Sequence, residues 1–258
     1  KPVALVLSGN IPLVGFQSIL SVLIRGFHVQ IKPSSADAGL TTWILQKLVE
    51  VEPQFAAKIA IMERLGAHDL IIATGSNNSA RYFEYYFGKK PHIIRKNRNS
   101  VAILDGSETP EQIAELGHDI FDYFGLGCRS VSKIYIPENY DIAQLYEGIA
   151  DFHLVSQHHK YGNNYDYNKS IFLINGDVHS DNGFLLLKED KSWASPLAVV
   201  HFERYAALAD VVNDFEAAQD QIQCVVTNAQ IKSSVPVFSF GESQCPALDD
   251  YADGVDIL

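Results

Sequence analysis

Segments with the periodicity of buried strands and of amphipathic helices alternate through the first half of the chain. Val3 to Leu7 is a continuous apolar run, as in a parallel strand buried on both faces, and a helical pattern follows from about Leu13 to Arg25. The same order recurs with strands at 28–31 and 69–73, a helix at 37–51 and a helix that ends at Tyr85. This alternation is typical of a parallel α/β sheet, and it predicts an α/β fold.

The second half of the chain predicts a second α/β lobe. Its expected strands lie at 101–104, 133–136, 170–174, 184–187, 197–202 and 224–227, and its expected helices at 110–121, 142–152 and 205–218. We place the division near Arg95 to Ser100, because the strand that begins at Val101 leads into a new set of elements. The sequence thus predicts two lobes, at 1–98 and 99–258.

Charge and cysteine content exclude several classes of protein. The formal net charge of −11 argues against a nucleic-acid-binding protein, because a phosphate backbone demands a basic face. Three cysteines at 128, 224 and 245 resemble neither a disulfide framework nor a zinc site, which favours the cytoplasm. The most apolar stretch, Ile11 to Ile24, is too short to span a bilayer, so no membrane span is expected. Because the chain starts directly on a core strand, we expect Lys1 to lie inside a larger domain.

Polar, turn-forming residues follow the first three predicted strands, at Ser8-Gly9-Asn10, Lys32-Pro33-Ser34-Ser35 and Thr74-Gly75-Ser76-Asn77. In parallel sheets, ligands bind beyond the carboxyl ends of the strands, where helix N-termini point their N–H groups outward. A nucleotide site at this edge is therefore the natural hypothesis. The alternative is that each piece is a simple turn, and the chain has neither a Gly-x-Gly-x-x-Gly fingerprint nor a Walker motif.

The segment Gly125-Leu126-Gly127-Cys128-Arg129-Ser130 lies between a predicted helix, capped at Thr109, and a predicted strand that ends at Pro137. Glycine adopts positive φ readily and lets a substrate approach the backbone, so a thiol on this turn indicates a nucleophile. The alternative is a small, packed hydrophobic residue. We interpret Cys128 as the reactive residue, because pocket chemistry explains a glycine-flanked thiol better than packing does.

Other histidines and cysteines carry less information. A histidine among His153, His158 and His159 could assist a thiolate, but no acidic partner at a telling spacing orients them, which favours a surface or lobe-interface role. Cys224 lies in an apolar strand and is expected in the core, whereas Cys245 lies in a loop and has no assignable role. No spacing of His, Cys or carboxylates suggests a metal site.

Taken together, these segments resemble the aldehyde dehydrogenase superfamily, and within it the acyl-CoA reductase branch typified by the fatty-acid reductase subunit of bioluminescent bacteria. The resemblance covers most of the chain and is carried by Ser8 to Pro12, Ile31 to Ser35, Thr74 to Ser76 and Gly125 to Ser130. It implies a bacterial oxidoreductase with a parallel-sheet nucleotide-binding lobe at 1–98 and an α/β catalytic thiol lobe at 99–258. The N-terminal part of the family's nucleotide domain is then absent from this chain.

By this resemblance, the Cys128 thiolate attacks a thioester, coenzyme A leaves, and the remaining acyl-enzyme is reduced to an aldehyde by hydride from a nicotinamide. The oxyanion that forms needs preorganised donors, which the resemblance assigns to the Asn10 side-chain amide and the Cys128 backbone N–H. The alternative for Asn10 is a strand-ending turn. The implied substrate is an acyl-CoA or an acyl-protein, and the implied assembly is either a homo-oligomer or a complex with an acyl-activating enzyme.

The resemblance also assigns the cofactor contacts. Lys32, with Ser34 and Ser35, would reach the adenosine ribose, and Thr74-Gly75-Ser76 would face the diphosphate at a helix N-terminus. NAD-preferring relatives commonly carry Glu at position 35. Without that carboxylate a 2′-phosphate meets no like charge and Lys32 attracts it, so NADPH is expected over NADH. The alternative for Ser35, a helix N-cap, is compatible with both cofactors.

Two departures from the oxidising members of the superfamily bear on the reaction. Arg95 stands about where those enzymes keep the glutamate that activates water, and a guanidinium cannot be that base because it is always protonated and has no acceptor. Near Trp193, the family's Glu and Phe close to the nicotinamide ribose are replaced by Ser192 and Ala194. Two alternatives stay open: an NAD(P)-dependent aldehyde-oxidising dehydrogenase and a non-catalytic acyl-binding relative.

Overall fold

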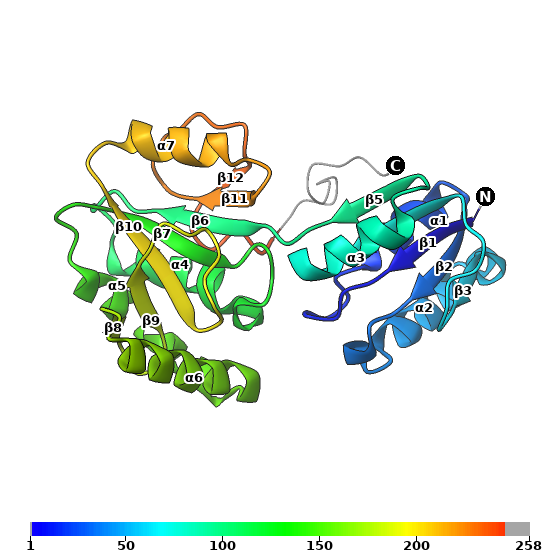
Figure 1. The fold of residues 1–258 in the computed structure, drawn as a ribbon, viewed down its shortest axis with the longest axis horizontal. Coiled ribbons are helices and arrows are strands. Elements are labelled where there is room, and N and C mark those ends of the chain that lie inside the picture. The colour runs from blue at the N-terminus through cyan, green and yellow to red at the C-terminus, as the bar shows by residue number, and fades with distance from the viewer. Residues whose placement is uncertain (1, 246–258) are drawn as a thin grey trace. The chain divides into compact units, whose positions relative to one another are not determined.

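The structure is a computed structural model that describes residues 2–245, apart from the side chain of Asn77. The described residues divide between Asn97 and Arg98 into two compact units, each built around its own sheet (Figure 1). We call residues 2–97 the first unit and residues 98–245 the second unit. Residues 246–258 of the predicted second lobe lie outside the described part of the chain.

The first unit is a five-stranded parallel sheet in the order β3-β2-β1-β4-β5. Its strands are β1 (Pro2–Val6), β2 (His28–Lys32), β3 (Ile59–Ile61), β4 (Leu70–Thr74) and β5 (His92–Arg95). Its helices are α1 (Phe16–Ile24), α2 (Leu40–Val51) and α3 (Asn77–Phe87), with 3₁₀ turns at Ser35–Asp37 and Pro53–Lys58. The chain leaves β1 toward β2 and leaves β4 toward β5, so the strand order reverses between β1 and β4.

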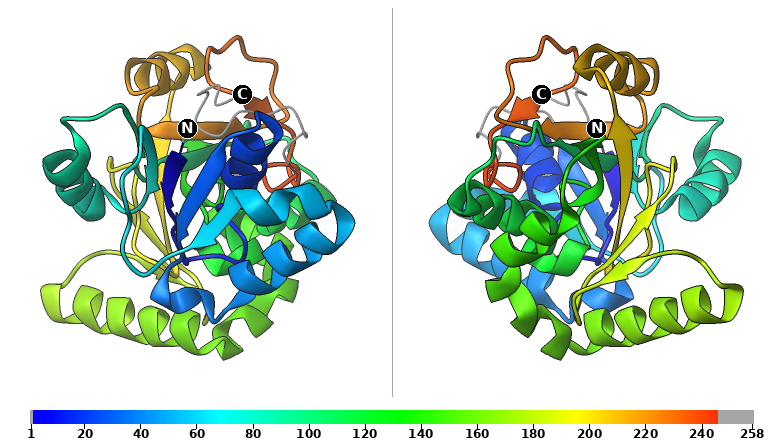
Figure 2. Two further views of the ribbon diagram at one scale, coloured as in Figure 1. Left: turned by 90° about the vertical axis from the view of Figure 1, so that its right-hand side faces the viewer. Right: turned by 90° about the vertical axis from the view of Figure 1, so that its left-hand side faces the viewer.

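The helices of the first unit cover both faces of its sheet. Ile19 of α1 and Leu45 of α2 pack with Leu5 and Ile31 in one buried cluster. Right-handed crossovers in opposite directions place α3 on the other face, and Figure 2 shows α3 across the sheet from α1 and α2. The carboxyl ends of β1 and β4 therefore open at a topological switch point, the usual ligand site of such sheets.

Two helices of the first unit start later than the sequence predicts. The helix expected from Leu13 begins at Phe16, because Leu13 adopts a left-handed φ of 55° and its carbonyl accepts from Phe16 N at 2.9 Å in a turn. The helix expected from Asp37 begins at Leu40, because Ala38 and Gly39 are both left-handed. Trp43, which belongs to the apolar stripe of this helix, is 52% exposed.

The second unit holds a seven-stranded sheet in the order β12-β11-β6-β7-β10-β9-β8, parallel except for the β8–β9 pair. Its strands are β6 (Asn99–Ile103), β7 (Val131–Pro137), β8 (Ser180–Asp181), β9 (Leu186–Glu189), β10 (Val199–Tyr205), β11 (Ile222–Val226) and β12 (Val237–Phe238). Its helices are α4 (Pro110–Phe121), α5 (Ile142–Gly148), α6 (His159–Asn175) and α7 (Leu208–Ala217), with 3₁₀ turns at Asp122–Gly125 and Ala150–Gln157.

Alternate residues of β6 and Leu104, which follows it, face two separate cores. Ala102 and Leu104 pack in a cluster with residues of α4, α5 and α6, whereas Val101 and Ile103 pack with Val211 and Phe215 of α7. Figure 2 shows α6 and α7 on opposite sides of this unit. The continuous apolar character of β6 follows from this burial on both faces.

The strand expected at 170–174 is wrong, because these residues form the end of α6. Tyr161, Tyr165, Asn168 and Phe172 are buried at spacings of four, three and four residues, which is a helical period. The apolar run that suggests a strand instead places Ile174 in solvent, where it is 80% exposed.

Among the described residues, no helix combines the length and the apolar character needed to cross a membrane.

Candidate active site

The thiol turn, residues 125–130, connects α4 to β7 as predicted. A capping box starts α4: Thr109 Oγ1 accepts from Gln112 N, and Gln112 Oε1 accepts from Thr109 N at 2.9 Å. At the end of α4, Tyr123, Phe124 and Gly125 are all left-handed, which reverses the chain direction before Cys128. Phe124 is also stacked on His158, with ring centroids 3.8 Å apart.

Hydrogen bonds fix both peptide groups of Cys128. Ser100 Oγ, from the start of β6, donates to the Cys128 carbonyl at 2.9 Å. Ser130 N donates to the Gly127 carbonyl at 3.1 Å. Because the C=O and N–H of one trans peptide point in opposite directions, the Cys128 N–H points away from Ser130. The Cys128 side chain itself is partly exposed.

A second set of contacts holds the turn from the carboxyl-terminal side of the unit. Residues 239–244, which we call the strap, are bound by the buried Asp119 of α4, whose carboxylate accepts from Gly241 N at 2.7 Å and Ser243 N at 3.0 Å. The Ser243 carbonyl in turn accepts from Arg129 Nη1 at 3.2 Å, next to Cys128. Asp119 is thus linked through the strap to the residue that follows the thiol.

The other two cysteines have different surroundings. Cys224 of β11 is fully buried, as predicted, and its Sγ lies 3.1 Å from Ser100 Oγ. Burial raises the pKa of the Cys224 thiol to about 11, so this thiol stays protonated and unreactive at neutral pH. Cys245 is exposed at the end of the described residues.

Asn10 lies on the exposed turn after β1 in the first unit. Ser8 Oγ donates to Asn10 Oδ1 at 2.5 Å, which engages the oxygen of the amide, the end that an oxyanion would not use. Gly9 permits a close approach between strand ends, because a Cβ there would lie 2.5 Å from Ser34 Oγ. The turn that carries Asn10 is therefore packed against the residues that follow β2.

Lys32, Ser34 and Ser35 share one pocket of about 750 Å³ beyond the ends of β1, β2 and β3. Its walls are completed by Val6, Leu7, Pro33, Ile61, Met62 and Glu63. Ser34 is the N-cap of the 3₁₀ turn, since its Oγ accepts from Ala36 N at 3.2 Å, so the N-cap alternative for Ser35 is wrong. Its lining is mostly apolar, and Lys32 and Glu63 contribute one charge of each sign.

Glu63 is the pocket residue that the sequence did not reveal. It follows β3, a three-residue edge strand that was not predicted, and the pocket therefore does hold a carboxylate despite the serine at position 35. The apolar run Ile59–Ile61 after Pro53 was the available signal, but so short a run does not distinguish a strand from a helix end.

Thr74 ends β4, and Gly75 and Ser76 connect it to the N-terminus of α3. Ser76 caps the helix, with its Oγ accepting from Ser79 N at 3.2 Å. A Cβ at Gly75 would lie 2.9 Å from the Ser79 Cβ, so glycine allows the strand end to pack against the helix start. The amide groups at the start of α3 thus stand at the switch point, where a diphosphate would meet a positive helix end.

Arg95 is the last residue of β5 and is directed into the first unit. Its Nη1 donates to Ser18 Oγ of α1 at 2.9 Å, and its side chain is buried.

In the second unit, contacts from β7 hold the loop around Trp193. Ser132 Oγ donates to the Trp193 carbonyl at 2.7 Å, and Lys133 Nζ lies 4.7 Å from the centroid of the Trp193 ring. Ser192 and Ala194 are exposed on this loop.

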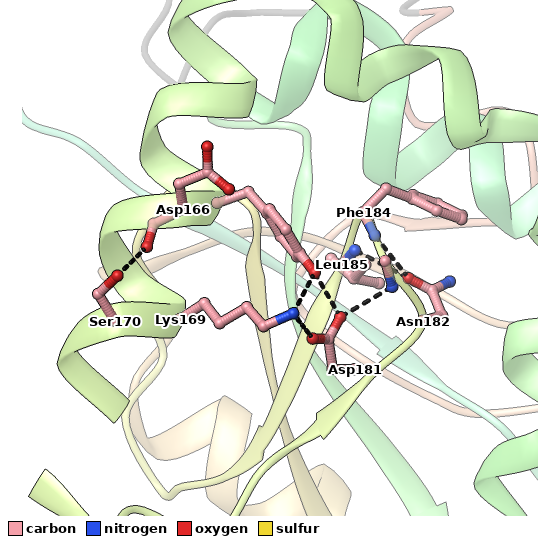
Figure 3. A network of polar contacts seen from close by, with 9 residues as sticks. Asp166, Lys169, Ser170, Asp181, Asn182, Phe184 and Leu185 are labelled. Atoms are coloured by element: carbon pink, nitrogen blue, oxygen red, sulfur yellow. Dashed lines mark hydrogen bonds and ion pairs between the residues drawn. The ribbon is translucent and has the colours of Figure 1, made fainter. Parts of the chain in front are cut away.

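A separate polar cluster fastens α6 to the β8–β9 hairpin (Figure 3). Lys169 Nζ lies 2.6 Å from Asp181 Oδ2, and Tyr165 OH donates to Asp181 Oδ1 at 2.7 Å. Burial and then the Asp181 carboxylate raise the pKa of Tyr165, so the phenol keeps its proton. The ion pair and the hydrogen bond to Asp181 stabilise the hairpin against α6. Within residues 2–245, no group of three His, Cys, Asp or Glu side chains could hold a metal ion.

Comparison with known proteins identifies the family. A protein-family model described as "Acyl-CoA reductase (LuxC)" matches residues 2–161, more than half of the chain, including both Asn10 and Cys128. The chain belongs to the acyl-CoA reductase (LuxC) family. A curated relative, "Long-chain acyl-protein thioester reductase 2" of Photobacterium leiognathi, is 27% identical over 154 residues, which is 53% of this chain and 32% of that protein.

Solved structures share the fold. A putative aldehyde dehydrogenase of Burkholderia cenocepacia matches with a TM-score of 0.70 at 16% identity, over 93% of this chain and 63% of that one. An indole-3-acetaldehyde dehydrogenase of P. syringae, solved with NAD⁺ and IAA, matches with a TM-score of 0.69 at 13% identity, over 88% and 56%. The predicted aldehyde dehydrogenase-like α/β fold is confirmed. This acyl-CoA reductase family chain spans about a third of the curated relative and a little over half of these structures.

Proposed function

We propose that the chain forms an acyl-enzyme thioester on Cys128, and that this thioester is reduced with NADPH to an aldehyde. The Cys128 thiolate attacks the carbonyl carbon of the acyl thioester, the bond from that carbon to the coenzyme A sulfur breaks, and coenzyme A leaves as the thiol after taking up a proton. When bound, NADPH supplies the hydride that replaces the Cys128 sulfur on the acyl carbon.

The observation that carries the proposal is that hydrogen bonds fix the turn around Cys128. The carbonyls on both sides of this residue accept hydrogen bonds from Ser100 and Ser130, so its N–H has a fixed direction before substrate arrives. A donor that needs no reorganisation stabilises an oxyanion more than a mobile one does. We assign the second donor to the Asn10 amide, whose oxygen is engaged by Ser8.

Reduction is favoured over hydrolysis by the surroundings of Arg95. Its guanidinium is bound to Ser18 in the interior of the first unit and cannot take a proton from water. No acidic residue occurs in the sequence between Gly88 and Leu104 to replace it. The acyl-enzyme is therefore expected to survive until hydride arrives.

Dinucleotide binding is supported by two features of the first unit. The pocket at the ends of β1, β2 and β3 has the volume and the mostly apolar lining that suit an adenosine, and Lys32, Ser34 and Ser35 are among its lining residues. The start of α3, with Thr74, Gly75 and Ser76, suits the diphosphate. A preference for NADPH over NADH is supported by Lys32 and by the serine at position 35, and the Glu63 carboxylate of the same pocket opposes it.

The substrate proposed from the family is an acyl-CoA or an acyl-protein, the second because the Photobacterium relative is named an acyl-protein thioester reductase. Assembly as a homo-oligomer or with an acyl-activating enzyme, and a cytoplasmic location in a bacterium, belong to the same proposal.

The test is mass spectrometry of the purified chain after mixing with acyl-CoAs of different lengths, followed by NADPH oxidation assays. We expect one acyl group on the peptide that contains Cys128, and aldehyde release with NADPH consumption. Cys128→Ala should abolish both, while Cys245→Ala, which removes an exposed thiol, should leave both unchanged.

Three outcomes would overturn the proposal in different ways. Acylation that persists in Cys128→Ala would show that another group is the nucleophile. Net acid production from an aldehyde and NAD⁺ would favour an oxidising dehydrogenase. Stoichiometric acylation without NADPH consumption would favour a non-catalytic acyl-binding relative.

A further inference from the structure

The pocket at the ends of β1, β2 and β3 contains two charged residues of opposite sign, Lys32 and Glu63. The other lining residues are apolar or uncharged: Val6, Leu7, Pro33, Ser34, Ser35, Ile61 and Met62. A ligand that enters this pocket therefore meets one cation and one carboxylate. The charge that it carries decides which of the two attracts it.

The pairing of β2 with β3 brings both residues to the same end of the sheet, with Lys32 opposite Met62 and Glu63 one residue further on. Ile31 pairs with Ile61, and Met62 N donates to the Ile31 carbonyl at 2.8 Å. Lys32 and Glu63 each come one residue after the groups joined by that bond. Both side chains line the one pocket, at the ends of strands that lie about 4.8 Å apart.

We propose that Glu63 is the residue that recognises an unphosphorylated adenosine ribose in this pocket, and that it opposes a 2′-phosphate. The inference rests on the proposed dinucleotide function of the first unit. A carboxylate accepts hydrogen bonds from the 2′- and 3′-hydroxyls of a ribose, and it repels the phosphate that replaces the 2′-hydroxyl in NADPH. Lys32 attracts that phosphate, so the preference of the chain for NADPH is a balance between Lys32 and Glu63.

The neighbouring serines are less suited than Glu63 to bind the ribose hydroxyls. Ser34 Oγ accepts from Ala36 N as the cap of the 3₁₀ turn, and Ser35 carries no charge. Among the residues that line the pocket, Glu63 is the only one that offers a carboxylate to ribose hydroxyls. The strand order places it at the edge of the sheet, one strand beyond the position where NAD-preferring relatives commonly carry Glu.

The experiment titrates the whole chain with 5′-AMP and with 2′,5′-ADP by calorimetry, which tests the pocket without the nicotinamide or the thiol. Glu63→Gln should tighten 2′,5′-ADP binding by about tenfold and weaken 5′-AMP binding by about threefold, because one like charge and one strong acceptor are removed. Lys32→Gln should weaken 2′,5′-ADP binding and change 5′-AMP binding little. Glu50→Gln, which removes the same charge from the exposed pair with Lys47, is the matched control.

Repeating the titrations at higher ionic strength distinguishes direct recognition by Glu63 from a general change in the structure. The gain of Glu63→Gln for 2′,5′-ADP should shrink as ionic strength rises, since screening weakens the repulsion it removes. The loss for 5′-AMP should persist, because it comes from hydrogen bonds.

Each outcome has a defined meaning. Equal changes for the two ligands in Glu63→Gln, or no change in either, would overturn the role of Glu63. Absence of binding of both ligands to the unaltered chain would overturn it together with the cofactor part of the proposed function. Opposite changes in the two ligands, in a chain whose Cys128 is never acylated, would support the role of Glu63 and refute the proposed chemistry.

Discussion

In the first unit, the residues proposed to bind the dinucleotide lie at the carboxyl ends of β2 and β4, whereas in the second unit Cys128 precedes the amino end of β7. Lys32 and Ser35 are exposed, while Ser100 and Asp119, which hold the thiol turn, are fully buried. Exposed groups can meet a hydrated, charged ligand at little cost in desolvation. A nucleophile and its oxyanion donor need a fixed geometry, and buried hydrogen bonds provide it.

If burial makes the second unit the rigid one, the largest effect should come from Asp119→Ala. We expect the free energy of unfolding to fall by about 2–4 kcal/mol, because Gly241 N and Ser243 N each lose a buried acceptor at a cost of about 1–3 kcal/mol. Urea denaturation of the whole chain measures this loss. Asp122→Ala, which removes a more exposed carboxylate just beyond the same helix, is the control. Equal losses for the two variants would contradict the role of the strap.

A smaller loss of stability is expected when an exposed residue of the proposed dinucleotide site is replaced. Ser76→Ala removes the N-cap of α3 and should lower the free energy of unfolding by about 1 kcal/mol. It should also weaken NADPH binding, measured by fluorescence titration, without changing the rate of Cys128 acylation. Slower acylation in this variant would show that the two functions are not separable.

Ser100→Ala should slow the acylation of Cys128 and leave nucleotide binding unchanged. Losing the hydrogen bond to the Cys128 carbonyl costs about 1 kcal/mol, which corresponds to about fivefold slower acylation by acyl-CoA. Stopped-flow release of coenzyme A measures this rate, and binding of 2′,5′-ADP should be unchanged. Ser170→Ala removes a similar hydroxyl bond on the surface of α6 and should alter neither property.

The smallest effect concerns the pH dependence of stability. Burial raises the pKa of Asp119, so the folded chain favours its protonated form. The resulting stabilisation is complete below the ordinary pKa of an aspartate and is lost as pH rises through the folded pKa. The free energy of unfolding of the unaltered chain, minus that of Asp119→Asn, should therefore decrease as pH rises from about 3.8. A constant difference across this range would show that burial of Asp119 carries no cost.

Local patterns predicted the frame of the fold. The apolar runs of β1, β4 and β6, the capped start of α4 and the turn that carries Cys128 are all confirmed in the structure. The strand expected at 170–174 was wrong because an apolar run at the end of α6 has no visible period within five residues. The edge strands β3 and β5 were missed because short runs at a sheet edge are only partly buried.

The sequence by itself determined an α/β chain with polar strand ends and a thiol on the turn before β7, because burial period and turn chemistry are encoded within a few neighbouring residues. Only the tertiary structure placed Glu63 in the pocket of Lys32, bound Asp119 to Gly241 across 122 residues, and set Ser100 between Cys128 and Cys224. These contacts depend on strand register and on the packing of distant segments. No local pattern encodes them, since their partners meet only after the sheets have formed.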